Sequence, residues 1–146
     1  MTIQELAIQL ESKGCRLYRC SEEDVLAVED FFGITLPSAY RVFLLNMGNG
    51  AGVFMLGSSV FYDEIFNLKD WATELLEEDG FKPLPEDVFV CWMHQGYQFA
   101  FFYPNQGDDP PIYFYHENKT KENFEKVADS FTDFLQQLLA SDGLDR

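Results

Sequence analysis

The stretch that decides the fold is "GITLPSAYRVFLLNMGNGAG", residues 33–52. Its end, Gly-Asn-Gly-Ala-Gly at 48–52, resembles at first sight a glycine-rich loop that cradles a phosphate. Phosphate loops of the P-loop and Rossmann kinds follow a strand and open a helix, so that helix N–H groups face the anion. Here the glycines end a run whose apolar residues recur at helical spacing from Tyr40 to Met47, so helix carbonyls face them. Since no Lys-Ser/Thr pair follows the glycines either, the stretch predicts a helix and its end rather than a phosphate site.

Helix-start signals lie on both sides of this stretch. Pro37 suits the first turn of the central helix, because the N–H that proline lacks has no helical partner there. Elsewhere a Ser or Thr with an acid three residues later forms a capping-box pattern, and an Asn can cap a further helix. The sequence thus predicts helices that start after Thr2, Ser21, Asn67 and Ser130, with Gly14, Gly33 and Gly80 ending the first three.

Short segments rich in β-branched and aromatic residues predict a sheet. They are "VFMLG" (53–57), "SVFYDE" (59–64), "DVFVCWMH" (87–94), "YQFAFFY" (97–103) and "IYFYHE" (112–117), while "CRLYRC" (15–20) is typical of an extended segment. Gln95-Gly96 predicts a hairpin. The later strands are apolar on both faces, so we expect helices to cover at least part of the sheet. The order predicts one α+β domain over residues 1–146, a mainly antiparallel sheet packed by N-terminal helices, a middle helix and a C-terminal helix.

The charge balance restricts the partners. The chain carries 25 Asp and Glu against 10 Lys and Arg, a net charge of −15. Such a chain repels phosphate backbones and anionic lipid surfaces, which argues against nucleic-acid and membrane partners. Its field steers a basic partner inward and raises the association rate. The alternative is that the charge only keeps the protein soluble.

The cysteines and the N-terminus predict a cytoplasmic protein. Three cysteines, an odd number, and no signal-peptide pattern in "MTIQELAIQLESKG" indicate free thiols in a reducing compartment. No uncharged apolar run approaches the ~20 residues that a membrane-spanning helix needs.

Motifs for catalysis, cofactors and metals are missing from the sequence. It contains no GxSxG, HExxH, EF-hand or CxxC pattern, and Cys15-x4-Cys20 lacks the second pair of a zinc site. We therefore expect no cofactor, no metal and no enzymatic activity. The alternative is a hydrolase that uses His94 or His116, each at the end of a predicted strand, although structural or surface roles fit both histidines better.

One segment concentrates the negative charge. Residues 63–87 hold nine acids and two bases, a charge of −7. The helix predicted in this segment also carries Trp71, a residue type that anchors interfaces. We expect a partner-binding surface made of Asp63, Glu64, Asp70, Trp71, Glu74, Glu77, Glu78 and Asp79. The alternative is that Trp71 belongs to the core and the acids form a solvated helix face.

The stretch that decides the fold also carries a family resemblance. "EDFFGITLPSAYRVFLLNMGNGAG" resembles the signature of the SUKH superfamily: a helix with an acid, a short hydrophobic-x-Leu-Pro link, and an aromatic-bearing helix that stops at an Asn-Gly turn. "IYFYHEN" resembles the family's late strand and "ADSFTDFLQQLL" its terminal helix. The resemblance runs from about Leu17 to Leu139 and departs at "HQGYQFAFFYPN", where many relatives have a Gly-Asp/Asn turn. The matching positions are Glu29, Gly33, Ile34, Leu36, Pro37, Tyr40, Phe43, Leu44, Asn49 and Gly50, then Ser130, Phe131, Phe134 and Leu135.

This resemblance implies a non-enzymatic α+β binding domain. Bacterial members of the superfamily are typically immunity proteins that neutralise polymorphic or contact-dependent toxins, often nucleases, whereas fungal members include regulators of cell-wall assembly and signalling. The single-domain length is more similar to the bacterial kind. The resemblance and the charge together favour an immunity protein that binds a cognate toxin, a basic nuclease domain. A regulatory scaffold of the cell-wall type is the alternative, and the oligomeric state stays open.

Overall fold

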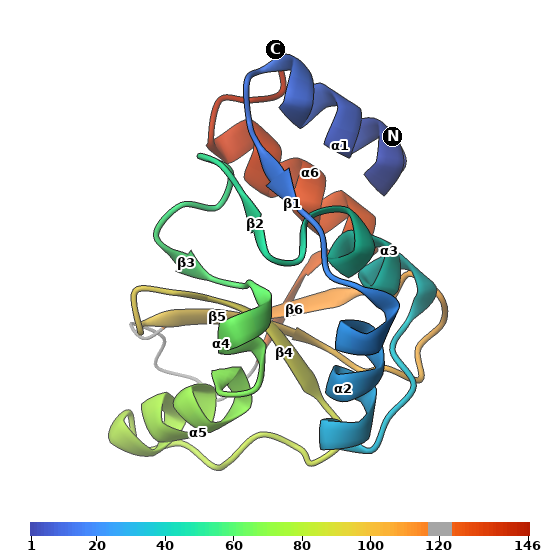
Figure 1. Cartoon of the computed structure of the whole chain (residues 1–146). Helices are drawn as coiled ribbons and strands as arrows, with labels where there is room; N and C mark the ends of the chain where they lie inside the picture. Colours follow the sequence, from blue (N-terminus) through green and yellow to red (C-terminus); the bar gives the residue numbers. More distant parts are fainter. Residues whose placement is uncertain (117–123) are drawn as a thin grey trace.

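The structure, a computed structural model, describes residues 1–116 and 124–146 and builds an antiparallel sheet between layers of helices (Figure 1). The helices are α1 (Ile3–Ser12), α2 (Glu22–Phe32), α3 (Ser38–Met47), α4 (Tyr62–Ile65), α5 (Leu68–Glu78) and α6 (Phe131–Ser141). The strands are β1 (Leu17–Tyr18), β2 (Gly50–Ala51), β3 (Ser58–Ser59), β4 (Phe89–His94), β5 (Gln98–Phe102), β6 (Ile112–His116) and β7 (Glu125–Ala128). The predicted α+β class is confirmed.

The main sheet has the strand order β3-β4-β5-β6-β7, and each neighbouring pair is antiparallel. One face packs in a core with residues of α1, α2, α3 and α6, and the other face packs in a second core under α5. Helices therefore cover both faces, as the apolar strands predict. A separate two-stranded sheet joins β1 to β2 beside α3.

The residues 33–52 stretch folds as its pattern predicts. Tyr40, Phe43, Leu44 and Met47 have at most 1% of their surface exposed. The Glu29 carboxylate of α2 accepts a hydrogen bond from the Leu36 N–H at 2.7 Å, which fixes the link into α3. After α3 the chain runs along β1, where the Asn49 side chain donates to the Arg19 carbonyl. Gly48 lies so close to this neighbourhood that an added Cβ would stand 2.5 Å from the Cys20 sulfur.

The capping predictions are confirmed at Thr2, Ser21 and Ser130, and the one at Asn67 is wrong. Reciprocal capping boxes form at Thr2 with Glu5 and at Ser21 with Asp24, and the Ser130 hydroxyl accepts from the Asp133 N–H. Asn67 precedes α5 but its side chain makes no capping hydrogen bond. Pro37 lies one residue before the first helical residue of α3 rather than within the first turn.

The two early strand predictions are wrong. "VFMLG" (53–57) is a series of turns whose N–H groups bond to carbonyls three residues back, with Met55 and Gly57 in the left-handed region at φ 58° and 86°. Phe54 and Met55 are both buried while Val53 and Leu56 are exposed, so the alternation of a strand is missing.

Of "SVFYDE" (59–64), only Ser59 belongs to a strand, and α4 takes the end of the segment. Phe61 and Tyr62 pack against the core that α1, α2, α3 and α6 share with the sheet instead of forming a ladder, so tertiary contacts override their β-propensity. The strands β2 and β7 are additions that the sequence patterns did not predict. Glu117, the last residue of the predicted strand 112–117, and Asn118 lie outside the described residues.

A β-bulge in β4 sets which side chains face which helix. Val90 pairs with Phe101 and Trp92 pairs with Ala100, so Cys91 is an extra residue on β4. Two residues facing one partner residue is the mark of a bulge, and it shifts the alternation of the strand. Cys91 and Trp92 therefore both join the core on the α6 side, while Val90 and Met93 join the core under α5.

All three cysteines are free and buried. Burial, with a smaller contribution from the charge of Asp24, raises the pKa of Cys20 to about 12, and burial also raises the pKa of Cys91. The thiols of Cys20 and Cys91 are therefore neutral near pH 7. Within the described residues, no helix has the length and apolar character needed to cross a membrane.

Candidate protein-interaction site

Helix α5 is amphipathic, and its faces decide where the predicted site residues lie. Leu68, Ala72, Leu75 and Leu76 are buried against the sheet. Because residues three and four apart share a helix face, Trp71, Glu74 and Glu78 lie together along one flank. Asp70 and Glu77 are seven residues apart and point to solvent on the side opposite the buried stripe.

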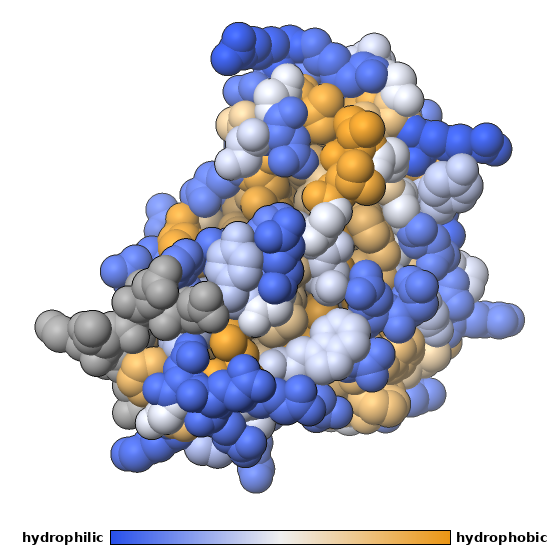
Figure 2. Space-filling model, turned by 90° about the vertical axis from the view of Figure 1, so that its left-hand side faces the viewer, coloured by the Kyte–Doolittle hydropathy of each residue, from blue (hydrophilic) through white to orange (hydrophobic). Residues whose placement is uncertain are grey.

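The flank with Trp71 borders a surface pocket of about 430 Å³, here called the acidic pocket. Three acids line it: Glu74 and Glu78 from α5, and Glu64 from α4. The opposite wall comes from β3 and from the tip of the β4–β5 hairpin, and its lining residues are Gly57, Ser59, Met93, Gln95 and Gly96. The elements that form this pocket lie on the side of the molecule that Figure 2 presents, below an apolar patch.

The hairpin tip has a backbone conformation that suits its residues. His94 pairs with Gln98, and the connecting loop places Gln95 and Gly96 in the left-handed region at φ 51° and 77°. Glycine adopts this region without strain, and consecutive left-handed residues are typical of tight hairpins. The predicted Gln95-Gly96 hairpin is confirmed, and its backbone faces the carboxylates of α5.

The acidic pocket carries negative charge. Glu74 and Glu78 are exposed, and Glu64 accepts a hydrogen bond from the Ser59 hydroxyl at 2.9 Å. In residues 1–116 and 124–146, none of these three carboxylates has a Lys or Arg within ion-pair distance. Lys69 of the same helix donates instead to the Glu86 carbonyl at 2.6 Å. The pocket therefore presents negative charge beside an aromatic ring, a combination that suits Lys or Arg side chains of a partner.

The structure gathers four of the eight predicted residues and separates the other four. Glu64, Trp71, Glu74 and Glu78 line the acidic pocket. Outside it, Asp63, Asp70 and Glu77 are exposed, and the Asp79 carboxylate accepts a hydrogen bond from the Tyr115 hydroxyl. Trp71 is 37% exposed, so the alternative that it belongs to the core is wrong.

Sequence reasoning missed the pocket wall opposite α5. The Gln95-Gly96 pattern predicts the hairpin, but it does not tell on which face of the sheet the tip meets a helix. Gly57, predicted in a strand, belongs to a turn, and Ser59 belongs to β3; both line the acidic pocket with residues of α5. Strand order and the side on which a helix packs depend on contacts distant in sequence, which local patterns do not contain.

The two histidines of the hydrolase alternative do not form a pair. His94 lies on β4 and His116 lies on β6. Measured between ring centroids, Tyr97 lies 6.0 Å from His94 and 5.9 Å from His116. His94 Nδ1 lies 2.9 Å from the Ser58 hydroxyl oxygen. A nucleophile–base pair also needs a group that orients the base. The described residues show no carboxylate bonded to His94.

No group of three or more His, Cys, Asp or Glu residues in the described part of the chain is arranged to hold a metal ion. The expectations of no metal, no cofactor and no enzymatic activity stay predictions.

Comparison with known families gives a match over most of the chain. The family model of the SMI1 / KNR4 family (SUKH-1) matches residues 19–137, which is more than half of the chain. The matched range includes α3, the acidic pocket, the whole main sheet and the larger part of α6. A search of curated proteins finds no match.

Proposed function

The chain belongs to the SMI1 / KNR4 family (SUKH-1), and from this premise we propose that it is an immunity protein that binds and neutralises a cognate bacterial toxin. The toxin domain is a basic nuclease, and it docks on the acidic pocket. Members of the superfamily bind partner proteins, and this family includes both toxin-immunity proteins and regulators. The charge of this chain favours the first role.

The observation that carries this proposal is the acidic pocket. A nuclease cleft that binds a phosphate backbone is lined by Lys and Arg. Glu64, Glu74 and Glu78 present carboxylates that no Lys or Arg of residues 1–116 and 124–146 neutralises, so such a cleft finds complementary charge there. The net charge of −15 extends the attraction beyond the contact surface and accelerates the encounter.

Trp71 supplies aromatic contact area to the proposed interface. Its ring is 37% exposed and lies between the acids of the pocket, so a partner can bury it on binding. Buried tryptophans surrounded by polar contacts are typical binding hot spots, and their truncation costs about 2 kcal/mol or more. We expect Trp71→Ala to weaken the complex by about thirtyfold.

The first experiment is a pull-down with the toxin encoded beside the gene, together with protection of cells that express this toxin. A complex and survival of the cells are expected. Failure of both would overturn the immunity role. A gene neighbourhood without any toxin, combined with capture of a signalling or envelope protein, would favour the regulatory scaffold instead.

The acidic pocket itself is tested by two charge-matched double variants. Glu74→Lys with Glu78→Lys reverses charge inside the pocket, and Asp70→Lys with Glu77→Lys makes the same charge change on the solvent face of α5. We expect the first variant to lower the affinity for the toxin at least tenfold more than the second. Equal losses in both variants would show that only net charge matters.

Association rates at low and high salt separate steering from contact. Since the Debye length falls from about 10 Å at 0.1 M salt to about 3 Å at 1 M, the association rate should fall steeply across this range. A flat salt response would remove the electrostatic part of the proposal.

A further inference from the structure

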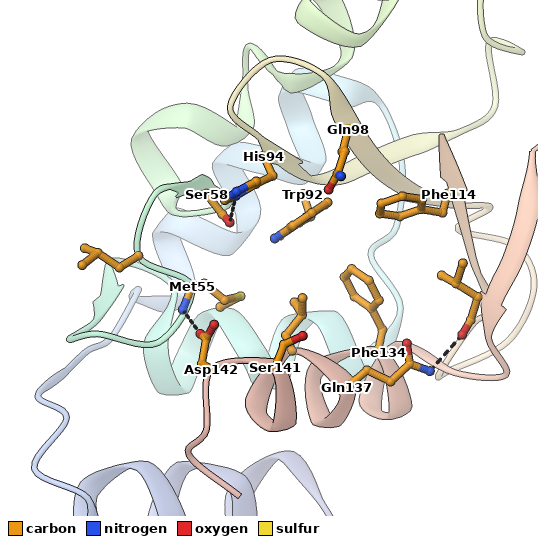
Figure 3. A pocket seen from close by; sticks show the side chains of 13 residues that line it. Met55, Ser58, Trp92, His94, Gln98, Phe114, Phe134, Gln137, Ser141 and Asp142 are labelled. Atoms are coloured by element: carbon orange, nitrogen blue, oxygen red, sulfur yellow. Dashed lines mark hydrogen bonds between the residues drawn. The ribbon is translucent and has the colours of Figure 1, made fainter. Parts of the chain in front are cut away.

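A second concavity lies between the main sheet and α6, on the face of the sheet away from the acidic pocket (Figure 3). This cavity, called the α6 cavity below, has a volume of about 480 Å³. Its walls come from the 53–57 turns, from the strands β4, β5 and β6, and from α6. Pockets for small molecules typically measure about 300–1,000 Å³, so this one has the size of a ligand site.

Aromatic and apolar side chains form most of the walls. Trp92 lies 5.7 Å from Phe114 and 5.9 Å from Phe134, measured between ring centroids, and its indole stacks parallel to the His94 ring. Met55 and Leu138 close the other sides. Flat aromatic walls of this kind suit a planar ligand that stacks against one ring and meets another edge-on.

Trp92 brings an unpartnered hydrogen-bond donor to the α6 cavity. Its side chain is only 6% exposed, and its Nε1 has no hydrogen-bond partner in the described part of the chain. In Figure 3 this nitrogen points into the space between Ser58, Met55 and Phe134. The bulge at Cys91 is the reason, because it turns Trp92 toward α6 rather than α5. A buried donor without an acceptor costs about 1–3 kcal/mol, so an acceptor at this place is stabilising.

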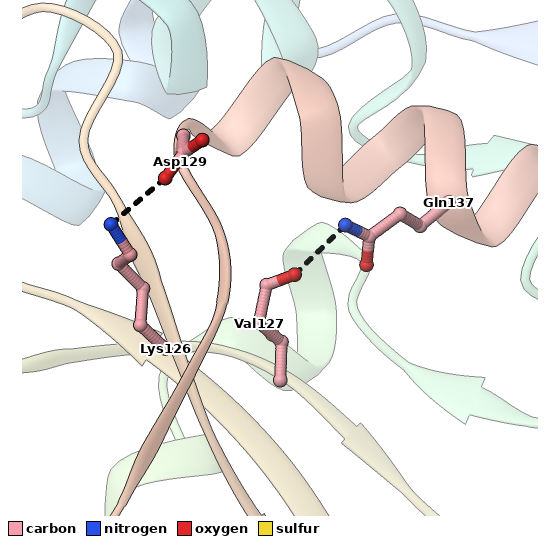
Figure 4. Close-up of polar contacts among 4 residues, drawn as sticks. All are labelled: Lys126, Val127, Asp129 and Gln137. Atoms are coloured by element: carbon pink, nitrogen blue, oxygen red, sulfur yellow. Dashed lines mark hydrogen bonds and ion pairs between the residues drawn. The ribbon is translucent and has the colours of Figure 1, made fainter.

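The other polar groups define the ligand further. The Gln98 side-chain amide points into the cavity, and Gln137 uses its Nε2 to bond to the Val127 carbonyl at 2.8 Å (Figure 4). The Gln137 oxygen therefore stays available as an acceptor. The Asp142 carboxylate at the rim accepts from the Met55 N–H at 2.9 Å. Among the residues that the structure describes, no Lys or Arg lines the cavity and a carboxylate borders it, so anionic ligands are disfavoured.

We propose that the α6 cavity is a binding site for a neutral, planar aromatic small molecule that carries a carbonyl acceptor beside an N–H donor. The carbonyl accepts from Trp92 Nε1, the N–H donates to an amide oxygen of Gln98 or Gln137, and the ring lies against Phe114 and Phe134. The site is independent of the acidic pocket, because Trp92 and His94 face α6 whereas Met93 and Gln95 face α5.

The indole N–H signals of the protein test this proposal directly. The chain has two tryptophans, so Trp92 reports on the α6 cavity and Trp71 serves as an internal control in the same ¹H–¹⁵N spectrum. Benzamide is the probe, because it has the proposed ring, carbonyl and N–H. We expect saturable displacement of the Trp92 signal with a Kd in the millimolar range for so small a probe, while the Trp71 signal stays in place.

Two comparison probes separate the proposed chemistry from general stickiness. Benzoate has the same shape with a negative charge, and toluene has the ring without an acceptor. We expect both to bind at least fivefold more weakly than benzamide, since a single hydrogen bond contributes about 1 kcal/mol. Equal binding of the three probes, or no movement of the Trp92 signal with any of them, would overturn the proposal.

Two variants on α6 test whether the probe binds in the α6 cavity. Ser141 lines the α6 cavity and its neighbour Ala140 does not, and both side chains are exposed, so phenylalanine is tolerated at either position. Ser141→Phe should lower the benzamide affinity about tenfold or more by occupying the cavity, and Ala140→Phe should leave it unchanged. Unchanged binding in Ser141→Phe would contradict the assignment. Neither experiment measures toxin binding, so each result tests this proposal independently of the proposed function.

Discussion

The residues 33–52 stretch and the acidic pocket treat their polar groups in opposite ways. In the first, the Leu36 N–H donates to the carboxylate of Glu29 in α2, and the Asn49 side-chain amide donates to the Arg19 carbonyl. In the second, Glu74 and Glu78 are exposed and lack a cationic partner in the described residues. Polar groups committed within the fold are unavailable to a ligand. The stretch that identifies the family is thus structural, and the capacity to bind lies in the uncommitted charges.

The largest expected effect is steric, at the glycine that ends α3. A Cβ at position 48 would lie 2.5 Å from the Cys20 sulfur and 2.7 Å from the Leu44 carbonyl oxygen. Overpacking of this kind costs about 3 kcal/mol, because the backbone cannot move away. We expect Gly48→Ala to lower the free energy of unfolding by this amount in urea titrations.

Gly107→Ala is the control for this prediction. Gly107 has a left-handed φ of 100° but nothing within 4 Å of an added Cβ. Its substitution therefore carries only the conformational cost, about 1 kcal/mol. Equal losses at both positions would show that close packing at Gly48 is unimportant.

The next effect tests the acid of the family signature. Glu29 is half-buried, and its bond to the Leu36 N–H holds the link between α2 and α3. Hydrogen bonds to charged groups contribute about 1.5–3 kcal/mol, so Glu29→Ala should lower the free energy of unfolding by about 2 kcal/mol. The exposed neighbour Asp30→Ala is the matched control and should change it by less than about 0.5 kcal/mol. Weaker toxin binding in Glu29→Ala at unchanged stability would contradict a purely structural role.

Tyr40 is the exception within residues 33–52, because its polar group has no partner among the described residues. Its substitution is predicted to raise the free energy of unfolding. Its hydroxyl is fully buried and has no hydrogen-bond partner in the described residues. The ring packs against Phe89, Phe102 and Phe131, and a phenylalanine ring would fill the same space. Tyr40→Phe should raise the free energy of unfolding by about 1 kcal/mol, because a buried unpaired hydroxyl is removed. A loss of stability in thermal and urea unfolding would mean that the hydroxyl has a partner in solution.

The sequence predicts those parts of the fold whose signals lie in residues close together along the chain. Capping residues and the periodicity from Tyr40 to Met47 are local, and they predict α1, α2, α3, α5 and α6 with ends within one or two residues. The 53–57 segment has strand-like residues but forms turns, because Phe54 and Met55 are drawn together into the core.

One half of the candidate site can be predicted from local sequence patterns, and the other half cannot. Helical spacing places Trp71, Glu74 and Glu78 on one flank of α5, so this half of the acidic pocket is readable from the sequence. The half made by Gly57 and Gln95 depends on strand order, and the α6 cavity depends on the bulge at Cys91. Neither strand order nor a bulge leaves a local pattern in these residues.

The smallest expected effect is the one that separates the two regions most clearly. Glu74→Lys with Glu78→Lys reverses two exposed charges in a chain whose net charge is −15, so it relieves repulsion and removes no ion pair between described residues. The free energy of unfolding should stay within about 0.5 kcal/mol of the parent protein or rise slightly. A loss near that of Glu29→Ala would mean that these carboxylates support the fold, and the division between structural and binding regions would fail. Unchanged stability together with weakened toxin binding assigns these charges to recognition, because selection for the fold alone does not require them.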